Sequence, residues 1–142
     1  MADSVDRETR SRIMGKVRHK DTKPEMVVRR LVHGAGYRYR LHDKRLPGKP
    51  DLVFKGRKKV IFVHGCFWHR HEGCALARLP KSREEFWIPK LEANKQRDRR
   101  NEDRLREMGW EVLVVWECEL SEIDVILEKI NEFLQKSRDT SE

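Results

Sequence analysis

Apolar residues along this chain follow two different spacings. In residues 27–32 and 123–134 they recur every three or four positions, which predicts helices that bury one face. In residues 52–54, 60–63 and 112–116 they form short, nearly continuous runs, which are typical of buried strands. The pattern therefore predicts a protein that packs helices against a sheet.

The order of these elements defines a fold class. In chain order we expect a helix from Thr22, strands at 37–41, 51–54 and 59–63, a helix at 84–108, a strand at 110–116 and a helix from 123. Gly34 or Gly36 is expected to end the first helix and Gly109 the second. This order indicates an α/β fold, with a mixed central β-sheet flanked by helices.

The first helix carries a capping signal. Thr22 suits the N-cap position, Pro24 is tolerated in the first turn, and Glu25 is placed to complete a capping box. Glu25 has a second interpretation as a residue that contacts a nearby catalytic site, directly or through water. The sequence favours neither interpretation over the other.

Length and polarity bound the organisation of the chain. Its 142 residues suit one compact domain, which we place at residues 21–136. Residues 1–20 are expected to form a polar arm or short helix outside the core, and residues 137–142 a frayed tail. No apolar run approaches the roughly 20 residues of a membrane span, and the polar N-terminus does not resemble a signal peptide. We therefore expect a soluble, intracellular protein.

Charge points to the class of partner. The formal net charge is +8 and the isoelectric point is near 9.6. An excess of Lys and Arg on a small domain attracts polyanions, of which nucleic acid is the most common. The alternative is a basic surface that only aids solubility.

Three cysteines and one histidine have metal-ligand spacing. Cys66, His71 and Cys74 lie in the irregular loop of residues 65–80, and Cys118 follows the strand that ends near residue 116. Three thiolates and one imidazole suit a tetrahedral, structural Zn²⁺. The alternative is three small buried side chains beside a surface histidine. Spacing alone does not exclude an exchange of His69 for His71.

An acidic residue and two histidines suggest a nuclease-like site. Asp51 follows Pro50 at the start of a strand, and the next apolar strand ends at His64, followed by His69. A carboxylate at a strand bend can hold Mg²⁺, which phosphodiester cleavage uses to polarise the phosphoryl group. Histidine suits the activation of water near neutral pH. Asp51 is alternatively a simple turn residue, and either histidine could instead bind zinc or only contact phosphate.

Aromatic residues lie beside this chemistry. Phe67 and Trp68 are in the cysteine loop, and Trp87 is near the start of the long charged helix. Exposed aromatic rings next to basic residues can stack on bases or wedge between base pairs. We expect Trp110 and Trp116, by contrast, to belong to the core.

These motifs together resemble one family, the very-short-patch repair endonucleases. The resemblance extends in order from about residue 3 to residue 120. It is most specific in the string Val63-His64-Gly65-Cys66-Phe67-Trp68-His69 and in Pro47-Gly48-Lys49-Pro50-Asp51 upstream. The resemblance implies a restriction-endonuclease-like fold and a nick 5′ to the thymine of a T:G mismatch left by deamination of 5-methylcytosine.

The resemblance also implies the catalytic roles. Asp51 would be the main Mg²⁺ ligand, with the backbone carbonyl of Val63 as a second. His69 would activate the attacking water, and His64 would assist at the phosphate. Glu25, if it contacts the catalytic site directly or through water, would belong to the same site.

Further implications concern DNA and zinc. Phe67, Trp68 and Trp87 would wedge into the DNA beside the mismatch, and the arm around Met14 would grip the minor groove. The structural zinc would be bound by Cys66, His71, Cys74 and Cys118. The implied partners are mismatched double-stranded DNA and other mismatch-repair proteins, in the cytoplasm of a bacterium and at its nucleoid. One active site that cuts one strand fits a monomer.

The sequence departs from the expected patterns in three respects. Val63 stands where the family has a hydroxylated residue, and residues 71–74 form a longer, less histidine-rich loop. Phe62 and His64 replace the acid and lysine of the broader restriction-enzyme pattern, which places more weight on Asp51 and His69. Two alternatives remain, namely a sequence-specific restriction or nicking endonuclease of the same fold, and a non-catalytic, zinc-containing DNA-binding module.

Overall fold

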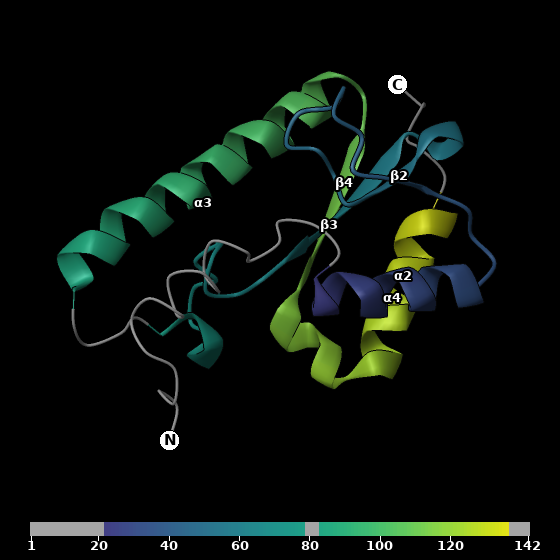
Figure 1. Ribbon diagram of the computed structural model, residues 1–142. Coiled ribbons are helices and arrows are strands. Elements are labelled where there is room, and N and C mark those ends of the chain that lie inside the picture. The colour runs from purple at the N-terminus through teal and green to yellow at the C-terminus, as the bar shows by residue number, and fades with distance from the viewer. Residues whose placement is uncertain (1–21, 79–82, 137–142) are drawn as a thin grey trace.

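The computed structural model describes residues 22–78 and 83–136. The predicted arm of residues 1–20, which includes Met14, lies outside this range, as does the predicted tail of residues 137–142. The described residues contain the predicted order of elements, and Figure 1 shows a central sheet between helices. The helices are α2 (Lys23–Gly34), α3 (Glu84–Glu107) and α4 (Ile123–Gln135), and the strands are β1 (Arg40–Leu41), β2 (Leu52–Phe54), β3 (Lys59–His64) and β4 (Glu111–Trp116).

The four strands form one mixed sheet in the order β1-β2-β3-β4. β1 pairs with β2 and β2 with β3 in antiparallel fashion, whereas β3 and β4 are parallel. All six residues of β3 are buried, as expected for a strand with a neighbour on each side and helices on both faces. β3 is therefore the centre of the fold.

The first predicted strand was too long. Residues 37–41 were expected to be extended, but only Arg40 and Leu41 pair with β2. The backbone N–H of Tyr37 donates to the carbonyl of Val32 in the last turn of α2, so this part of the segment ends the helix instead of extending the sheet. Tyr37 and Tyr39 still pack against the core as aromatic residues.

Alternate residues of each strand pack against different helices. Ile61 and Val63 of β3 join the core with α2 and α4, while Val60 and Phe62 face the opposite side, where Leu105 of α3 packs. Figure 1 shows α2 and α4 on one side of the sheet and α3 on the other. A one-residue shift in register would exchange these two sets, so the two cores fix the register together.

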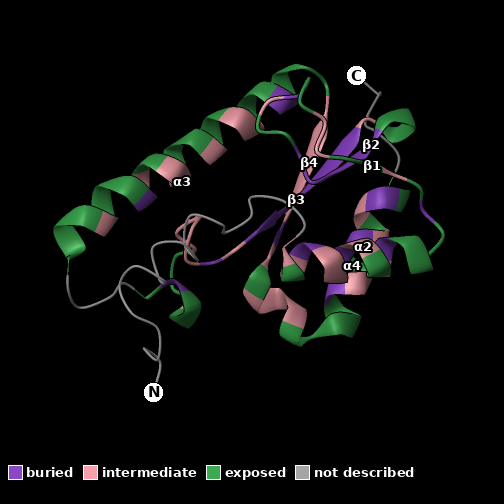
Figure 2. Cartoon of the chain, viewed as in Figure 1, coloured by how far each residue is buried: buried purple, intermediate pink, exposed green. Residues whose placement is uncertain are grey.

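The two helical layers differ in how far they are buried. α4 buries Ile126, Ile130 and Leu134 at helical spacing. α3 consists mostly of charged and polar residues and buries only Leu91 and Leu105. Figure 2 shows α3 exposed along most of its length. Most of α3 is therefore available for contact with another molecule.

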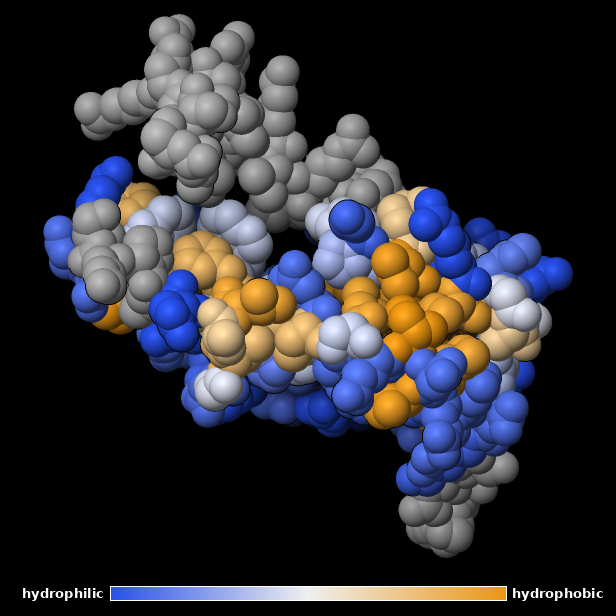
Figure 3. Space-filling view, turned by 90° about the horizontal axis from the view of Figure 1, so that it is seen from below, coloured by the Kyte–Doolittle hydropathy of each residue, from blue (hydrophilic) through white to orange (hydrophobic). Residues whose placement is uncertain are grey.

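Some apolar surface also faces solvent. Figure 3 shows a band of apolar side chains among polar ones on one face of the molecule. Among the described residues, the large apolar side chains that are most exposed include Leu76, Phe86 and Val125. In the described part of the chain, no helix has both the length and the apolar composition needed to cross a membrane.

Two isoleucines of α4 test the assignment of its buried face. Ile126 is 1% exposed and Ile123 is 39% exposed. Ile126→Ala should lower the free energy of unfolding by about 2–5 kcal/mol, because it opens a cavity in the core. Ile123→Ala should cost less than about 1 kcal/mol. Urea denaturation of both variants measures the difference, and equal losses would contradict the packing of α4.

Candidate active site and metal-binding residues

Asp51 is held at the junction of a turn and the sheet. It immediately precedes β2, and its Oδ2 accepts a hydrogen bond of 2.7 Å from the backbone N–H of Val63 in β3. The turn before it contains Gly48, at φ 77°, packed against Asn101 of α3 and Phe62 of β3. These contacts fix Asp51 at the beginning of β2, so that it is not a free turn residue.

Glu25 approaches Asp51 from α2. The N-cap prediction is confirmed, since Thr22 Oγ1 accepts from the Glu25 N–H at 3.3 Å. The Glu25 carboxylate is buried, receives hydrogen bonds from Arg29 and lies 2.6 Å from His42 Nε2. Single ligand atoms of Glu25, His42 and Asp51 lie within 4.8 Å of one another. This geometry favours the second interpretation of Glu25, in which its side chain belongs to the site.

The donor set of this cluster suits a cation. Burial and, secondarily, the Glu25 carboxylate raise the pKa of Asp51 to about 7, although the hydrogen bond from the Val63 N–H acts in the opposite direction. Two buried carboxylates repel each other when both are ionised, and a divalent cation bound between them offsets this repulsion. Glu25, His42 and Asp51 therefore fit a divalent metal ion.

The two histidines of the predicted site form a stacked pair. The rings of His64 and His69 lie 3.8 Å apart with an angle of 4° between their planes. His69 Nδ1 lies 2.5 Å from Asp98 Oδ2, a partner on α3. A carboxylate fixes the orientation of an imidazole and the nitrogen that carries its proton. His69 is thus oriented, as a general base needs to be.

His64 is buried at the end of β3. Burial lowers its pKa to about 3, and the neighbouring His69 acts in the same direction. Its Nδ1 has no hydrogen-bond partner among the described residues. His64 is therefore a neutral imidazole with one nitrogen unused by the described part of the chain.

The prediction for Trp116 was wrong. It was expected in the hydrophobic core, but it is only half-buried and contacts histidines instead. Its ring stacks on His71 at 4.1 Å and meets His64 edge-on at 5.1 Å. Trp110, in contrast, packs against the α3 core as expected. Trp116 is displaced from the core because β4 ends there, beside the cysteine loop.

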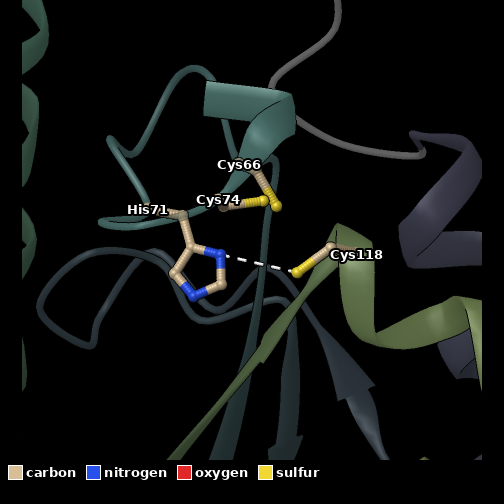
Figure 4. A group of neighbouring side chains, drawn as sticks. All are labelled: Cys66, His71, Cys74 and Cys118. Atoms are coloured by element: carbon tan, nitrogen blue, oxygen red, sulfur yellow. Dashed lines mark hydrogen bonds between the residues drawn. The ribbon is translucent and has the colours of Figure 1, made fainter. Parts of the chain in front are cut away.

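The predicted zinc ligands converge. Figure 4 shows Cys66, His71, Cys74 and Cys118 pointing toward a common centre from the loop after β3 and from the segment η3 (Glu117–Ser121) after β4. One ligand atom of each lies within 4.8 Å of all the others, and His71 Nδ1 is 3.5 Å from Cys118 Sγ. His71 is the histidine that lies with the cysteines, whereas His69 contacts Asp98 instead. Three sulfurs and one nitrogen fit a closed tetrahedral site.

The predicted wedge residues lie together. The ring centroids of Phe67 and Trp87 are 5.4 Å apart, and those of Trp68 and Trp87 are 6.0 Å apart. Phe86 extends this cluster toward solvent, with Arg83 and Lys90 over its ring. The cluster joins the cysteine loop to the start of α3. Met14, the fourth predicted contact, lies outside the described residues.

A cavity of about 270 Å³ opens beside the histidine pair. Its lining residues combine the catalytic candidates with cations: His64, His69, Asp98, Arg70, Lys95 and Arg99. Glu72 and Glu102 line it as well, so its walls carry charges of both signs. The cavity connects the histidine pair with the exposed face of α3.

Two residues of these clusters were not predicted. Asp98 lies in a charged helix where acidic and basic residues alternate, so nothing in its spacing distinguishes it. His42 follows a short edge strand and has no motif around it. Only the tertiary contacts of Asp98 with His69 and of His42 with Glu25 reveal them.

The fold belongs to a known class. Over 80% of this chain and 94% of the other, the structure is similar to the catalytic domain of the homing endonuclease I-Bth0305I, with a TM-score of 0.54 and 22% sequence identity. At this identity the similarity shows the fold alone. The class is thus an α/β fold shared with an endonuclease domain.

Sequence comparison identifies the family. Residues 2–76 match the family described as DNA mismatch endonuclease Vsr. The chain is 51% identical to the type II nicking enzyme V.XorIIP of Xanthomonas oryzae pv. oryzae, over 96% of this chain and all of that protein. It is 48% identical to the DNA mismatch endonuclease Vsr of Escherichia coli, over 84% of this chain and 76% of that protein. The chain belongs to the Vsr DNA mismatch endonuclease family, which confirms the resemblance seen in its motifs.

Two glycines test the turn that holds Asp51. Gly48 and Gly36 both have positive φ, but only Gly48 has close neighbours, with Asn101 Cβ 3.1 Å from an added Cβ. Gly36→Ala should cost about 1–2 kcal/mol for the left-handed backbone alone. Gly48→Ala should cost about 2–5 kcal/mol because overpacking adds to this strain. Urea denaturation compares the two, and equal losses would contradict the close packing of the turn.

Proposed function

We propose that this protein is a DNA endonuclease that nicks one strand 5′ to the T of a T:G mismatch, by Mg²⁺-dependent hydrolysis. The proposal includes a restriction-endonuclease-like fold and a substrate that arises by deamination of 5-methylcytosine. Membership of the Vsr family supports it. The observation that carries it is that consecutive residues at the end of β3 contact both groups, since the Val63 N–H donates to Asp51, which lies with Glu25, and the His64 ring stacks on His69, which pairs with Asp98.

The carboxylates form the cation site of this proposal. Asp51 would hold Mg²⁺ directly, with Glu25 beside it and the backbone carbonyl of Val63 as a further ligand. A bound Mg²⁺ would polarise the scissile phosphate and stabilise the leaving 3′ oxygen. The Val63 N–H keeps the Asp51 carboxylate at the sheet edge, so that its position does not depend on a flexible turn.

The histidines would manage the proton of the attacking water. With the Nδ1–H of His69 donating a hydrogen bond to the Asp98 carboxylate, the Nε2 atom of His69 would keep its lone pair and could accept a proton from water. His64, with its lowered pKa, stays neutral and would assist at the phosphate as a hydrogen-bond donor. Its burial against Trp116 and His69 fixes its orientation.

The DNA-binding surface would combine stacking and charge. Phe67, Trp68 and Trp87 would wedge between bases beside the mismatch, since they form one cluster at the start of α3. The cations of α3 would contact phosphates along its exposed face. The N-terminal arm around Met14 would add a contact from the minor groove. One site per chain is enough to cut one strand, so the protein would act as a monomer.

A sequence-specific nicking enzyme is the second candidate. The similar protein from Xanthomonas oryzae pv. oryzae is named a type II nicking enzyme, and the same catalytic groups would serve either activity. The two functions differ in whether a mismatch is required. A non-catalytic DNA-binding module, by contrast, gives no reason to bury Glu25 beside Asp51.

Asp51→Asn tests the catalytic cation site. The variant keeps the size of the side chain but removes the charge that holds Mg²⁺, so nicking of a T:G duplex should fall by at least about 100-fold. Binding of the duplex should stay within a few-fold of the original, as measured by fluorescence anisotropy. The exposed Asp124→Asn is the matched control and should nick normally. Normal nicking by Asp51→Asn would remove Asp51 from catalysis.

Cys118→Ser tests the zinc that we propose for the cysteine cluster. The loop of residues 65–78 is irregular apart from one short 3-10 turn, and zinc would tie it to Cys118, so zinc binding would supply free energy of folding. Zinc content should drop from about one ion per chain toward none, and the free energy of unfolding by more than about 3 kcal/mol. Ser121→Ala, which removes only a hydroxyl that donates to the Cys118 carbonyl, is the control. Elemental analysis and thermal melting measure both quantities, and an unchanged melting temperature would argue against structural zinc.

A further inference from the structure

His42 is held toward the carboxylate cluster by its backbone. It follows β1, and its N–H donates to the Asp51 carbonyl at 3.3 Å. Its φ is 47°, a left-handed conformation that is uncommon for a residue other than glycine. The residue thus takes a strained conformation at the place where its side chain reaches Glu25 and Asp51.

The side chain of His42 faces both carboxylates of the cluster. Its Nε2 lies 2.6 Å from Glu25 Oε2 and 3.9 Å from Asp51 Oδ1. The three side chains come from α2, from the segment after β1 and from the segment before β2. The side chain of His42 is 17% exposed, that of Glu25 2% and that of Asp51 12%. An ion held by both carboxylates would therefore meet the imidazole nitrogen as well.

The imidazole changes which cations the site prefers. Carboxylates alone suit hard ions such as Mg²⁺, whereas imidazole is a better ligand for first-row transition ions. Mn²⁺ accepts both kinds of ligand and can replace Mg²⁺ in octahedral sites. A nitrogen donor therefore favours Mn²⁺ relative to a site built from oxygen alone.

We infer that His42 is a direct ligand of the cation bound by Asp51 and Glu25, and that it raises the preference of the site for Mn²⁺ over Mg²⁺. This inference rests on the proposed cation site but not on the choice of DNA substrate. His42 would coordinate through Nε2, the atom that faces both carboxylates. The other reading of the geometry is that His42 only orients Glu25 through a hydrogen bond.

Substitution of His42 by Asn separates these readings. Asn tolerates left-handed backbone, so His42→Asn removes the imidazole while keeping the turn. The control is His33→Asn, which changes an exposed histidine in the last turn of α2. Melting temperatures of the zinc-loaded variants show whether each is folded, and Asp51→Asn locates the site.

The measurement is binding of Mn²⁺ to the full-length protein without DNA, followed by electron paramagnetic resonance. Electron spin-echo spectra of bound Mn²⁺ should show coupling to an imidazole nitrogen, and His42→Asn should abolish it. The same variant should weaken Mn²⁺ binding on the order of tenfold, while Mg²⁺ binding, measured by competition, changes much less. His33→Asn should match the original protein in both respects.

Several results would overturn the inference. Nitrogen coupling that is absent from the original protein, or that persists in His42→Asn, would show that His42 is not a ligand. An unchanged ratio of Mn²⁺ to Mg²⁺ affinity would do the same. If Asp51→Asn loses Mn²⁺ while His42→Asn keeps it, only this inference fails. If Asp51→Asn also binds Mn²⁺ normally, the cation site of the proposed function fails with it.

Discussion

The parallel pairing of β3 with β4 is the constraint on which the rest of the structure depends. Six residue pairs, from Lys59–Glu111 to His64–Trp116, hold the two strands in register. Parallel strands end at the same edge of a sheet, so the segments that follow them emerge side by side. One of these segments supplies Cys66 and His71 and the other supplies Cys118. The metal-ligand cluster and the histidine pair therefore lie at one edge because of this pairing.

Packed rings connect the two sites at that edge. His71 of the cysteine cluster stacks on Trp116, Trp116 meets His64 edge-on, and His64 stacks on His69. Asp98 then fixes His69 from α3. A change in the position of the cysteine loop would therefore be transmitted through rings in contact to the proposed general base. This arrangement would let the proposed structural metal support the position of the proposed catalytic groups.

The sequence predicted what depends on local pattern. The order of elements, the Thr22 cap and the candidate cysteine ligands follow from spacing and residue type, whereas the structure was needed to place His71, and not His69, with the cysteines. It did not reveal Asp98 or His42, because their partners lie 29 and 17 residues away along the chain and only the packing brings them together. The predicted extent of β1 was wrong because the Tyr37 N–H bonds to Val32 at the end of α2, and the predicted place of Trp116 was wrong because its ring stacks on His71, a residue distant along the chain.

The central claim is that this site cuts one strand of DNA because a mismatch is present. The most direct test is a strand-specific nicking assay on end-labelled duplexes that differ only in carrying T:G or C:G at one position, across varied flanking sequences, with Mg²⁺ or with EDTA. We predict a Mg²⁺-dependent nick 5′ to the T in the mismatched duplex alone. Equal cutting of the paired duplex would show a sequence-specific nicking enzyme instead, and the absence of cutting on every duplex would contradict the assignment of catalysis to Asp51 and His69.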